Sequence, residues 1–256
     1  MIMINYGGDR QTADGNGDAV MSKVLVHGGG YGAQCWDRLL PYLEGKVVAV
    51  DLPGRGSRSN VPLPTVTLDG CAMAVRDDIL AQDLTDVVLV GHSLAGVTIP
   101  RVVCLLPDRI RHIVLVSAVV PADGTRVLDG IDPEVREAVE AAIAGGVYAQ
   151  TREAGRTMLC NDLDEEQSAW ALDAVVDDAA ALLAEEVDLS GYAIGVPITY
   201  VRLDRDATYP PELQQLAQTR VGATAVHIDS GHLAMISQPI RLAEIINDCD
   251  RPAASA

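Results

Sequence analysis

The strongest constraint on this chain is an apolar segment that runs directly into a turn of small residues with a serine at its centre. Residues 87–90 are Val-Val-Leu-Val, and Gly91-His92-Ser93-Leu94-Ala95-Gly96 follow without a break. A strand-to-helix turn of this kind lifts a serine hydroxyl clear of a sheet, where a histidine can take its proton and make it nucleophilic. Ala95 replaces the last glycine of the usual G-x-S-x-G pattern, but the turn can still close. The segment predicts a catalytic Ser93 on a nucleophile elbow, with an ordinary strand-to-helix turn as the alternative.

Two aspartates and a histidine follow later apolar segments. Asp204 and Asp206 come after residues 197–203, and His232 follows a Ser-Gly turn after residues 225–228. Ligands of open α/β sheets bind at the carboxyl ends of the strands, and a histidine there can serve as general base. We predict that His232 activates the serine and that one aspartate orients it, although spacing alone does not choose between Asp204 and Asp206. Asp123, which follows another predicted strand, is a more remote candidate for the acid.

An earlier apolar segment ends in a glycine-rich loop. Val24-Leu25-Val26 leads into His27-Gly28-Gly29-Gly30. A loop of this HGGG type can supply one backbone N–H of an oxyanion hole, and the residue after the nucleophile supplies the other. We expect Gly29 and Leu94 to be these two donors.

Together these segments resemble the plant methylesterase and hydroxynitrile lyase branch of the α/β-hydrolase fold, with its bacterial esterase relatives, over about residues 22–248. The resemblance rests on His27–Trp36, Asp51–Gly56, Gly91–Gly96, Asp206–Gln214 and Gly231–Met235. The chain order serine, acid, histidine is also that of α/β-hydrolases. The resemblance favours Asp206 as the acid, because the family's acid precedes a Pro-Glu-Phe-Gln-like segment by the interval found here. It also implies a helical cap over the site.

Five residues are candidates for substrate contact. They are Gly28, Tyr31, His92, Leu233 and Trp170. Trp170 lies in the expected cap, where packing within the cap is the alternative interpretation. In the cyanogenic lyases of the resembled branch, a hydroxyl residue follows the first loop histidine and a lysine follows the catalytic histidine. Glycine and leucine stand at those positions here, so a departing cyanide would have no counter-charge and lyase activity of that kind is disfavoured.

The function that these residues favour is a serine carboxylesterase that cleaves small neutral esters through an acyl-enzyme. Relatives with an aspartate nucleophile are disfavoured, because position 93 is serine. Two alternatives stay open. One is a lyase, cyclase or carbon–carbon bond hydrolase of secondary metabolism on the same triad, and the other is a non-catalytic receptor for a small molecule.

Length and periodicity predict one α/β domain in 256 residues. Apolar runs at 23–27, 46–51, 86–91, 111–117, 196–203 and 224–229 predict about six strands of a mostly parallel sheet. Helices are expected on both faces, near 35–44, 67–83, 94–106, 210–219 and 236–248. Residues 21–120 and 196–256 form the expected core, 121–195 the inserted cap and 1–20 a flexible leader. Within the cap, helices should begin at Asp132-Pro133 and at Asp164, where Gln167 completes a capping box.

Charge and cysteine content limit the classes of ligand and partner that this chain is expected to bind. The net charge is −17, and residues 121–195 hold 17 acidic and 4 basic residues, which argues against nucleic acid and against anionic substrates. Five scattered cysteines predict free buried thiols without a disulfide framework or a metal site. We expect a cytoplasmic protein, without cofactor or membrane span, that binds a small-molecule ester; a homodimer is possible.

Overall fold

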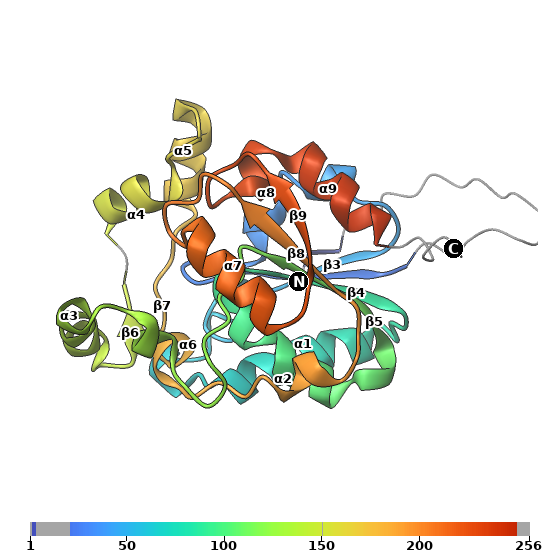
Figure 1. Cartoon of the computed structure of the whole chain (residues 1–256), viewed down its shortest axis with the longest axis horizontal. Coiled ribbons are helices and arrows are strands. Elements are labelled where there is room, and N and C mark those ends of the chain that lie inside the picture. Colours follow the sequence, from blue (N-terminus) through green and yellow to red (C-terminus); the bar gives the residue numbers. More distant parts are fainter. Residues whose placement is uncertain (1, 4–20, 150, 250–256) are drawn as a thin grey trace, which may run out of the picture.

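The computed structural model describes residues 2–3, 21–149 and 151–249. Six parallel strands form its centre, and they match the six strands predicted from the sequence (Figure 1). Their bounds are Lys23–Val26 (β2), Val47–Val50 (β3), Val87–His92 (β4), Ile110–Val116 (β5), Ile198–Leu203 (β8) and Thr224–Ile228 (β9). The order β3-β2-β4-β5-β8-β9 places β4 between β2 and β5. The predicted doubly wound parallel sheet is therefore confirmed.

A seventh strand lies within residues 1–20, the predicted flexible leader. Ile2–Met3 (β1) pairs antiparallel with β3, with Ile2 opposite Ala49 and Met3 opposite Val48. An edge strand offers free backbone donors and acceptors, and this short segment uses them. Residues 1 and 4–20 of the predicted leader lie outside the described residues.

Alternate residues of the central strands point to opposite faces of the sheet. Val24 and Val26 pack with helices α1 (Leu68–Ala81) and α2 (Ile99–Leu105), whereas Leu25 packs on the other face with α8 (Ala234–Ser237) and α9 (Pro239–Asp248). Figure 1 shows the two pairs of helices on opposite sides of the sheet. Because both faces are covered, the central strands β2 and β4 are buried along their whole length and lack the polar alternation of an exposed sheet, whereas β9 at the edge is mostly exposed.

Three expected helices are each divided into two shorter ones. The 35–44 segment forms 3-10 helices Ala33–Trp36 and Leu40–Tyr42, 94–106 forms 3-10 helix Ser93–Val97 and α2, and 236–248 forms α8 (Ala234–Ser237) and α9 (Pro239–Asp248). A proline stands in the first turn of the second piece in each case. Proline lacks an N–H and fits only the first turn, so each proline begins a new helix. The remaining core helix, α7, spans Pro211–Arg220.

Residues 121–195, here called the insertion, separate β5 from β8. The helix predicted at Asp132 is α3 (Pro133–Ile143), and the one predicted at Asp164 is α5 (Glu165–Asp173), with the capping box to Gln167 present. The insertion also contains elements that the sequence did not predict, namely β6 (Val147–Tyr148), α4 (Arg152–Leu159), β7 (Asp178–Ala179) and α6 (Ala181–Ala184). Strands β6 and β7 pair antiparallel, apart from the main sheet.

The insertion has a small apolar cluster of its own. Leu128, Ile143, Ala180 and Leu183 are buried together, and they come from segments on both sides of α4 and α5. Figure 1 places α3, α4 and α5 beside the sheet, away from α1 and α2. The insertion thus packs partly on itself and partly against the core.

All five cysteines are free, as the sequence predicts, but only Cys35, Cys71 and Cys160 are buried. Cys104 is exposed, which corrects the expectation that every thiol is buried. Among the helices of residues 21–149 and 151–249, none combines the length and hydropathy that a membrane span requires.

The contact between α2 and the end of the insertion gives a test of the packing. Gly191, in 3-10 helix Ser190–Ala193, lies so close to Pro100 that a Cβ would overlap its carbonyl oxygen. Gly191→Ala should therefore lower the free energy of unfolding by about 1–3 kcal/mol, because a buried backbone must shift. Gly145→Ala is the matched control, since its Cβ would point into open space. Equal melting temperatures for the two variants would contradict the packing described here.

Candidate active site

Ser93 lies directly after β4, at the carboxyl edge of the sheet, in a strained backbone conformation. Its φ angle is +53°, a left-handed value that serine rarely adopts. Close neighbours enforce this turn. A Cβ on Gly91 would come within 2.8 Å of the Ile99 side chain, and a Cβ on Gly28 within 2.7 Å of the Ser93 Cβ. The predicted elbow geometry is therefore present, and glycine is needed at both positions.

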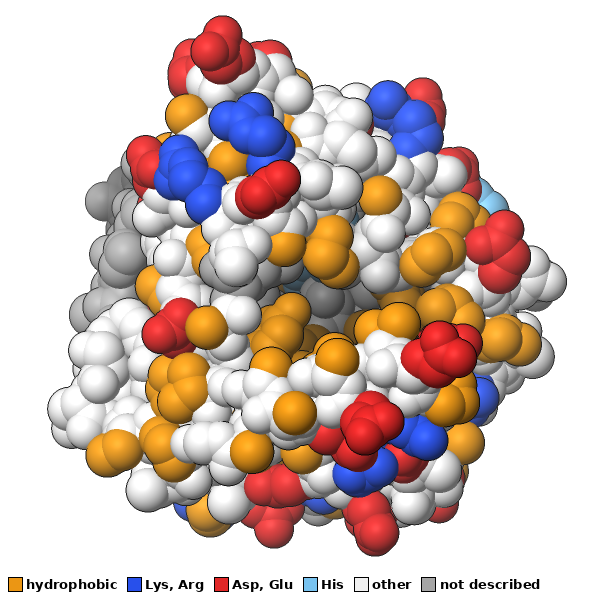
Figure 2. All heavy atoms as spheres, turned by 90° about the vertical axis from the view of Figure 1, so that its left-hand side faces the viewer, with side chains coloured by type: hydrophobic (Ala, Val, Ile, Leu, Met, Phe, Trp, Pro, Cys, Tyr) orange, Lys and Arg blue, Asp and Glu red, His pale blue; other side chains and the backbone are white. Residues whose placement is uncertain are grey.

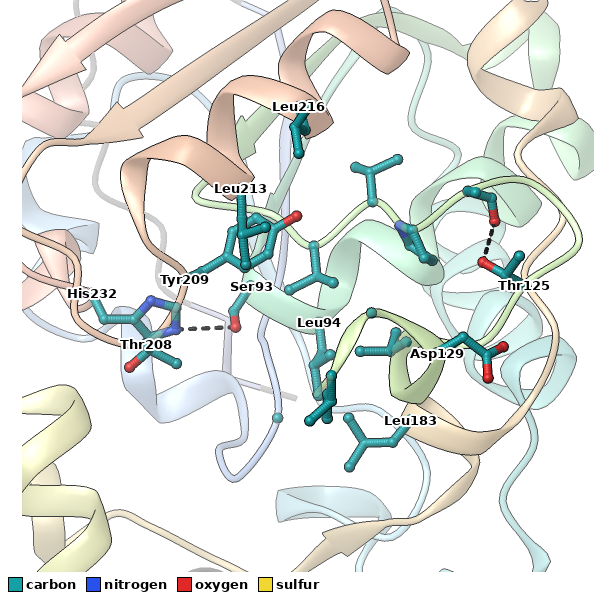
Figure 3. A pocket seen from close by; sticks show the side chains of 18 of the residues that line it. Ser93, Leu94, Thr125, Asp129, Leu183, Thr208, Tyr209, Leu213, Leu216 and His232 are labelled. Atoms are coloured by element: carbon teal, nitrogen blue, oxygen red, sulfur yellow. Dashed lines mark hydrogen bonds between the residues drawn. The ribbon is translucent and has the colours of Figure 1, made fainter. Parts of the chain in front are cut away.

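The structure brings together the three residues of the predicted triad, as Figure 3 shows for Ser93 and His232. His232 Nε2 lies 3.0 Å from Ser93 Oγ, and His232 Nδ1 lies 2.7 Å from Asp206 Oδ2. The carboxylate can only accept, so the Nδ1–H donates to it and Nε2 is left to accept the serine proton. All three residues are buried, with at most 8% of each exposed. This is the arrangement in which a serine hydroxyl becomes a nucleophile.

Asp206 receives hydrogen bonds from several donors besides His232. The Ser117 hydroxyl donates to Oδ2 (2.6 Å), and the backbone N–H groups of Thr208 and Tyr209 donate to Oδ1 (2.8 and 2.9 Å). Burial alone would raise the pKa of Asp206, but the interaction with His232 and these donors together hold its pKa below the usual value. The carboxylate is therefore ionised at neutral pH and can stabilise a histidinium beside it.

Asp204 occupies a different environment. Its Oδ1 bonds to Nδ1 of His227 (2.8 Å), and its side chain is 43% exposed. The neighbouring arginines Arg202 and Arg205 bond elsewhere, to the carbonyl of Pro211 and to Asp229 respectively. Strand β9 lies next to β8 and brings His227 opposite Arg202, within reach of the aspartate.

Asp123, the remote candidate for the acid, accepts the backbone N–H of Leu189 (2.8 Å). Its partner is therefore a backbone group of the insertion, and the hydrogen bond to the histidine Nδ1 is made by Asp206.

Two further histidines, His92 and His27, are buried next to the triad and its loops, and both are neutral. His92 Nε2 donates to the carbonyl oxygen of His232 (2.9 Å), and its ring lies 4.6 Å from the His232 ring. His27 accepts the N–H of Leu52 at Nε2 (3.1 Å) and donates to the Gly28 carbonyl through Nδ1 (2.8 Å). Burial lowers the pKa of both to about 3, helped by the nearby charges of His232 and Arg55 respectively. They act as fixed hydrogen-bonding groups that hold the loops in place.

The glycine-rich loop lies beside the nucleophile. A Cβ on Gly29 would come within 2.7 Å of the Leu94 side chain, so the two expected oxyanion-hole residues are neighbours. Gly29 and Leu94 both line the cavity that contains Ser93 and His232.

This cavity has a volume of about 540 Å³ and extends from the triad between α7 and the insertion. Its walls are mainly apolar, and Figure 3 shows Leu94, Leu183, Tyr209, Leu213 and Leu216 around Ser93. On the face of the molecule beside the insertion, Figure 2 shows a hollow surrounded mostly by hydrophobic side chains. Two oppositely charged residues, Asp129 and Arg220, also line the cavity.

The five candidates for substrate contact lie outside the lining of this cavity. Tyr31 is buried and donates to the Ala171 carbonyl (3.2 Å), and Leu233 is fully buried in the core. Trp170 packs on the same core cluster and lies under the Arg38 guanidinium, 5.6 Å from it. His92 bonds to the backbone carbonyl of His232, and Gly28 packs closely against Ser93.

The cavity walls are instead built by residues that the sequence did not single out. They come from the insertion and from α7, and include Val127, Ile131, Leu183, Leu213 and Leu216. These residues are apolar, and the sequence does not distinguish an apolar residue that lines a cavity from one that packs in the core. Ser117 was also missed, although the sequence carried one signal for it, a polar side chain at the last position of a predicted strand.

The insertion is tied to the loops that carry the acid and the histidine. Asp162 Oδ2 accepts the N–H of Gly231, directly before His232 (2.6 Å), and the Thr208 hydroxyl donates to the Met158 carbonyl (2.8 Å). The Asp162 side chain is 1% exposed. The predicted cap region therefore contributes both walls and supports to the site.

Comparison with known proteins agrees with this geometry. The model of the alpha/beta hydrolase family matches residues 24–245. The pyrethroid hydrolase of Sphingobium wenxiniae is 28% identical over 247 residues, which are 90% of this chain and 88% of that protein. The putative chloroplastic methylesterase 14 of Arabidopsis thaliana is 31% identical over 140 residues, 52% of this chain and 40% of that protein. An extracellular α/β-hydrolase from a Paenibacillus species has a structure with a TM-score of 0.82 and 25% identity, covering 91% of this chain and all of that one.

The chain belongs to the α/β-hydrolase family, because the family model spans most of its length. Within that family it is an enzyme of the carboxylesterase type, related to the methylesterase branch.

The two aspartates after β8 give a direct test of the triad. Asp206→Asn should lower kcat by about 10⁴-fold, because the amide cannot stabilise the histidinium and allows the wrong tautomer. Asp204→Asn is the matched control, since the Asp204 side chain bonds to an exposed histidine on β9, and it should keep kcat within about twofold. Steady-state cleavage of an activated ester such as p-nitrophenyl butyrate measures both. A reversed ranking would move the acid to Asp204.

Proposed function

We propose that this enzyme hydrolyses small neutral carboxylic esters through a covalent acyl-enzyme on Ser93. The observation that carries the proposal is the continuous hydrogen-bond chain from Ser93 through His232 to Asp206, which opens into an apolar cavity. A nucleophile, a base and an orienting acid in this geometry are the requirements of acyl transfer.

In the first half of the reaction, Ser93 Oγ attacks the ester carbonyl carbon and its proton passes to His232 Nε2. The carbonyl oxygen becomes an oxyanion, which the backbone N–H groups of Gly29 and Leu94 would stabilise. The C–O bond to the alcohol then breaks, and the histidinium returns the proton to the leaving alcohol. Asp206 stabilises the histidinium throughout.

In the second half, a water molecule attacks the acyl-enzyme. His232 takes one proton from the water, the Ser93–acyl bond breaks, and the proton returns to Ser93 Oγ. The carboxylic acid leaves and the enzyme is restored. No group outside the triad, the loop and water is needed for the balance.

The cavity supports the choice of substrate class. A volume of about 540 Å³ lies in the range of pockets that bind small organic molecules, and its walls offer mainly hydrophobic contact. Its acidic wall residue, Asp129, is paired with Arg126 (2.7 Å) and lies 3.7 Å from Arg136. These features support an ester with an apolar acyl or alcohol group.

Replacement of the nucleophile tests the proposal. Ser93→Ala should lower ester hydrolysis by about 10⁴-fold or more, while thermal unfolding stays close to that of the wild type, because the hydroxyl forms the covalent bond and adds little packing. Wild-type enzyme should also give a burst of p-nitrophenol close to one per active site when deacylation is slow. A Ser93→Ala protein with more than a tenth of wild-type activity would rule out the acyl-enzyme on Ser93.

The charge of the insertion predicts a preference between substrates. Residues 121–195 carry 17 acidic and 4 basic residues, and their field should slow the approach of anions within about 8 Å, the screening length at physiological salt. For two esters that differ only by a distal carboxylate, kcat/KM of the anionic ester should rise with ionic strength while that of the neutral ester stays nearly constant. An identical salt response of the two esters would show that the charges serve only the solvated surface.

A further inference from the structure

Asp178 is a buried carboxylate that the insertion places against the glycine-rich loop. It belongs to β7, and its side chain is 1% exposed. Its Oδ2 accepts the N–H of Gly30 (2.7 Å), and its Oδ1 accepts the N–H of Ala179 (2.6 Å) and lies 2.9 Å from Nη1 of Arg55. One carboxylate of the insertion thus joins the loop to a buried guanidinium of the core.

The insertion forms hydrogen bonds with both backbone groups of Gly30 in the glycine-rich loop. The N–H of Gly30 donates to Asp178, and the carbonyl of Gly30 accepts the N–H of Val176 (2.9 Å). Gly30 has a φ of +75°, a conformation that glycine tolerates without steric cost. With its donor and its acceptor both fixed, the peptide groups on either side of Gly30 have little freedom to turn.

The contact also reaches the expected oxyanion-hole donor. A Cβ on Gly29 would lie 3.5 Å from Asp178 Oδ2 and 2.7 Å from the Leu94 side chain. Asp178 and the elbow that carries Ser93 therefore both lie next to Gly29. A shift of the Asp178 side chain would move Gly29 relative to the nucleophile.

The ion pair is a costly way to hold a loop if stability alone were required. The Arg55 side chain is fully buried, and besides Asp178 it donates to the Pro53 carbonyl (2.7 Å). Within the described part of the chain, its Nε and Nη2 atoms have no hydrogen-bond partner. Buried ion pairs often stabilise a fold less than apolar side chains of the same size, so a contribution to stability does not by itself account for this pair.

We propose that Asp178 is a positioning residue for the oxyanion hole: through Gly30 it fixes the Gly29 N–H relative to Ser93, so that the insertion completes the catalytic geometry. This role rests on the proposed function, since it presupposes an oxyanion in the reaction. The insertion would then affect the rate of the chemical step as well as substrate binding.

The isosteric variant Asp178→Asn tests the role. The amide presents a donor to either Gly30 or Arg55, so the loop loses its fixed position, and kcat for p-nitrophenyl butyrate should fall by about 10²-fold, as expected for a misplacement of about 1 Å. The Ki of an alkyl trifluoromethyl ketone, which forms a tetrahedral adduct with an oxyanion, should rise by a similar factor. The Kd of the uncleaved ester, measured in the Ser93→Ala background, should stay within about threefold.

Two further variants separate positioning from general destabilisation. Asp78→Asn is the matched control, because Asp78 on α1 also forms a largely buried pair, with Arg58 (2.6 Å), but away from the Gly30 N–H; it should lower the melting temperature and keep kcat. The double variant Arg55→Met/Asp178→Leu removes both charges and should restore the melting temperature without restoring kcat or ketone affinity.

The outcomes distinguish the two proposals. Recovery of kcat along with the melting temperature in the double variant would overturn the positioning role, as would an Asp178→Asn enzyme with unchanged kcat and ketone affinity. In both cases the Ser93-dependent ester hydrolysis of the wild type would still stand. Absence of that hydrolysis in the wild type would overturn the proposed function and the positioning role together.

Discussion

The parallel pairing of β4 with β2 and β5 is the constraint on which the site depends. Val26 pairs with Gly91, and His92 pairs with Val116, so three strands end at the same level of the sheet. The glycine-rich loop, the elbow and Ser117 therefore emerge side by side. The register of β8 and β9 then brings the acid and histidine loops to the same edge. Because side chains alternate along a strand, a slip of one residue would turn every buried group to the wrong face.

Around this edge the protein buries polar groups that an ordinary core would exclude. His27, His92, Asp178 and Asp206 are each at most 4% exposed, and each has a hydrogen-bond partner. Buried polar groups are tolerated only when they are paired, and a paired network fixes a single arrangement. Burial keeps the two loop histidines neutral, so they act as fixed hydrogen-bonding groups around the His232–Asp206 pair.

The triad residues could be predicted from the sequence because catalytic groups occupy recognisable local contexts. Ser93 stands at a turn of small residues, and the histidine and acid follow strands whose apolar character is plain. The residues of the cavity walls could not be predicted in this way. Trp170 and Tyr31, which were expected to contact substrate, pack in the core instead. Whether an apolar side chain faces a cavity or a core depends on neighbours that are distant in the chain, and Leu216 and Val127 meet only after α7 and the insertion have packed. Asp178 was likewise hidden, because its importance comes from Gly30, 148 positions away.

By itself the sequence determined the six-stranded parallel sheet, the elbow at Ser93, the chain order of the triad and the first helix caps of the insertion. These features follow from local periodicity, turn chemistry and capping, which act over a few residues. The tertiary structure decided that Asp206 contacts His232 while Asp204 contacts His227, since both aspartates follow the same strand and only the approach of β9 and its loop separates them. It also decided which residues enclose the cavity and that the insertion holds the glycine-rich loop. Those outcomes depend on contacts between segments far apart in the chain, for which local pattern carries no signal.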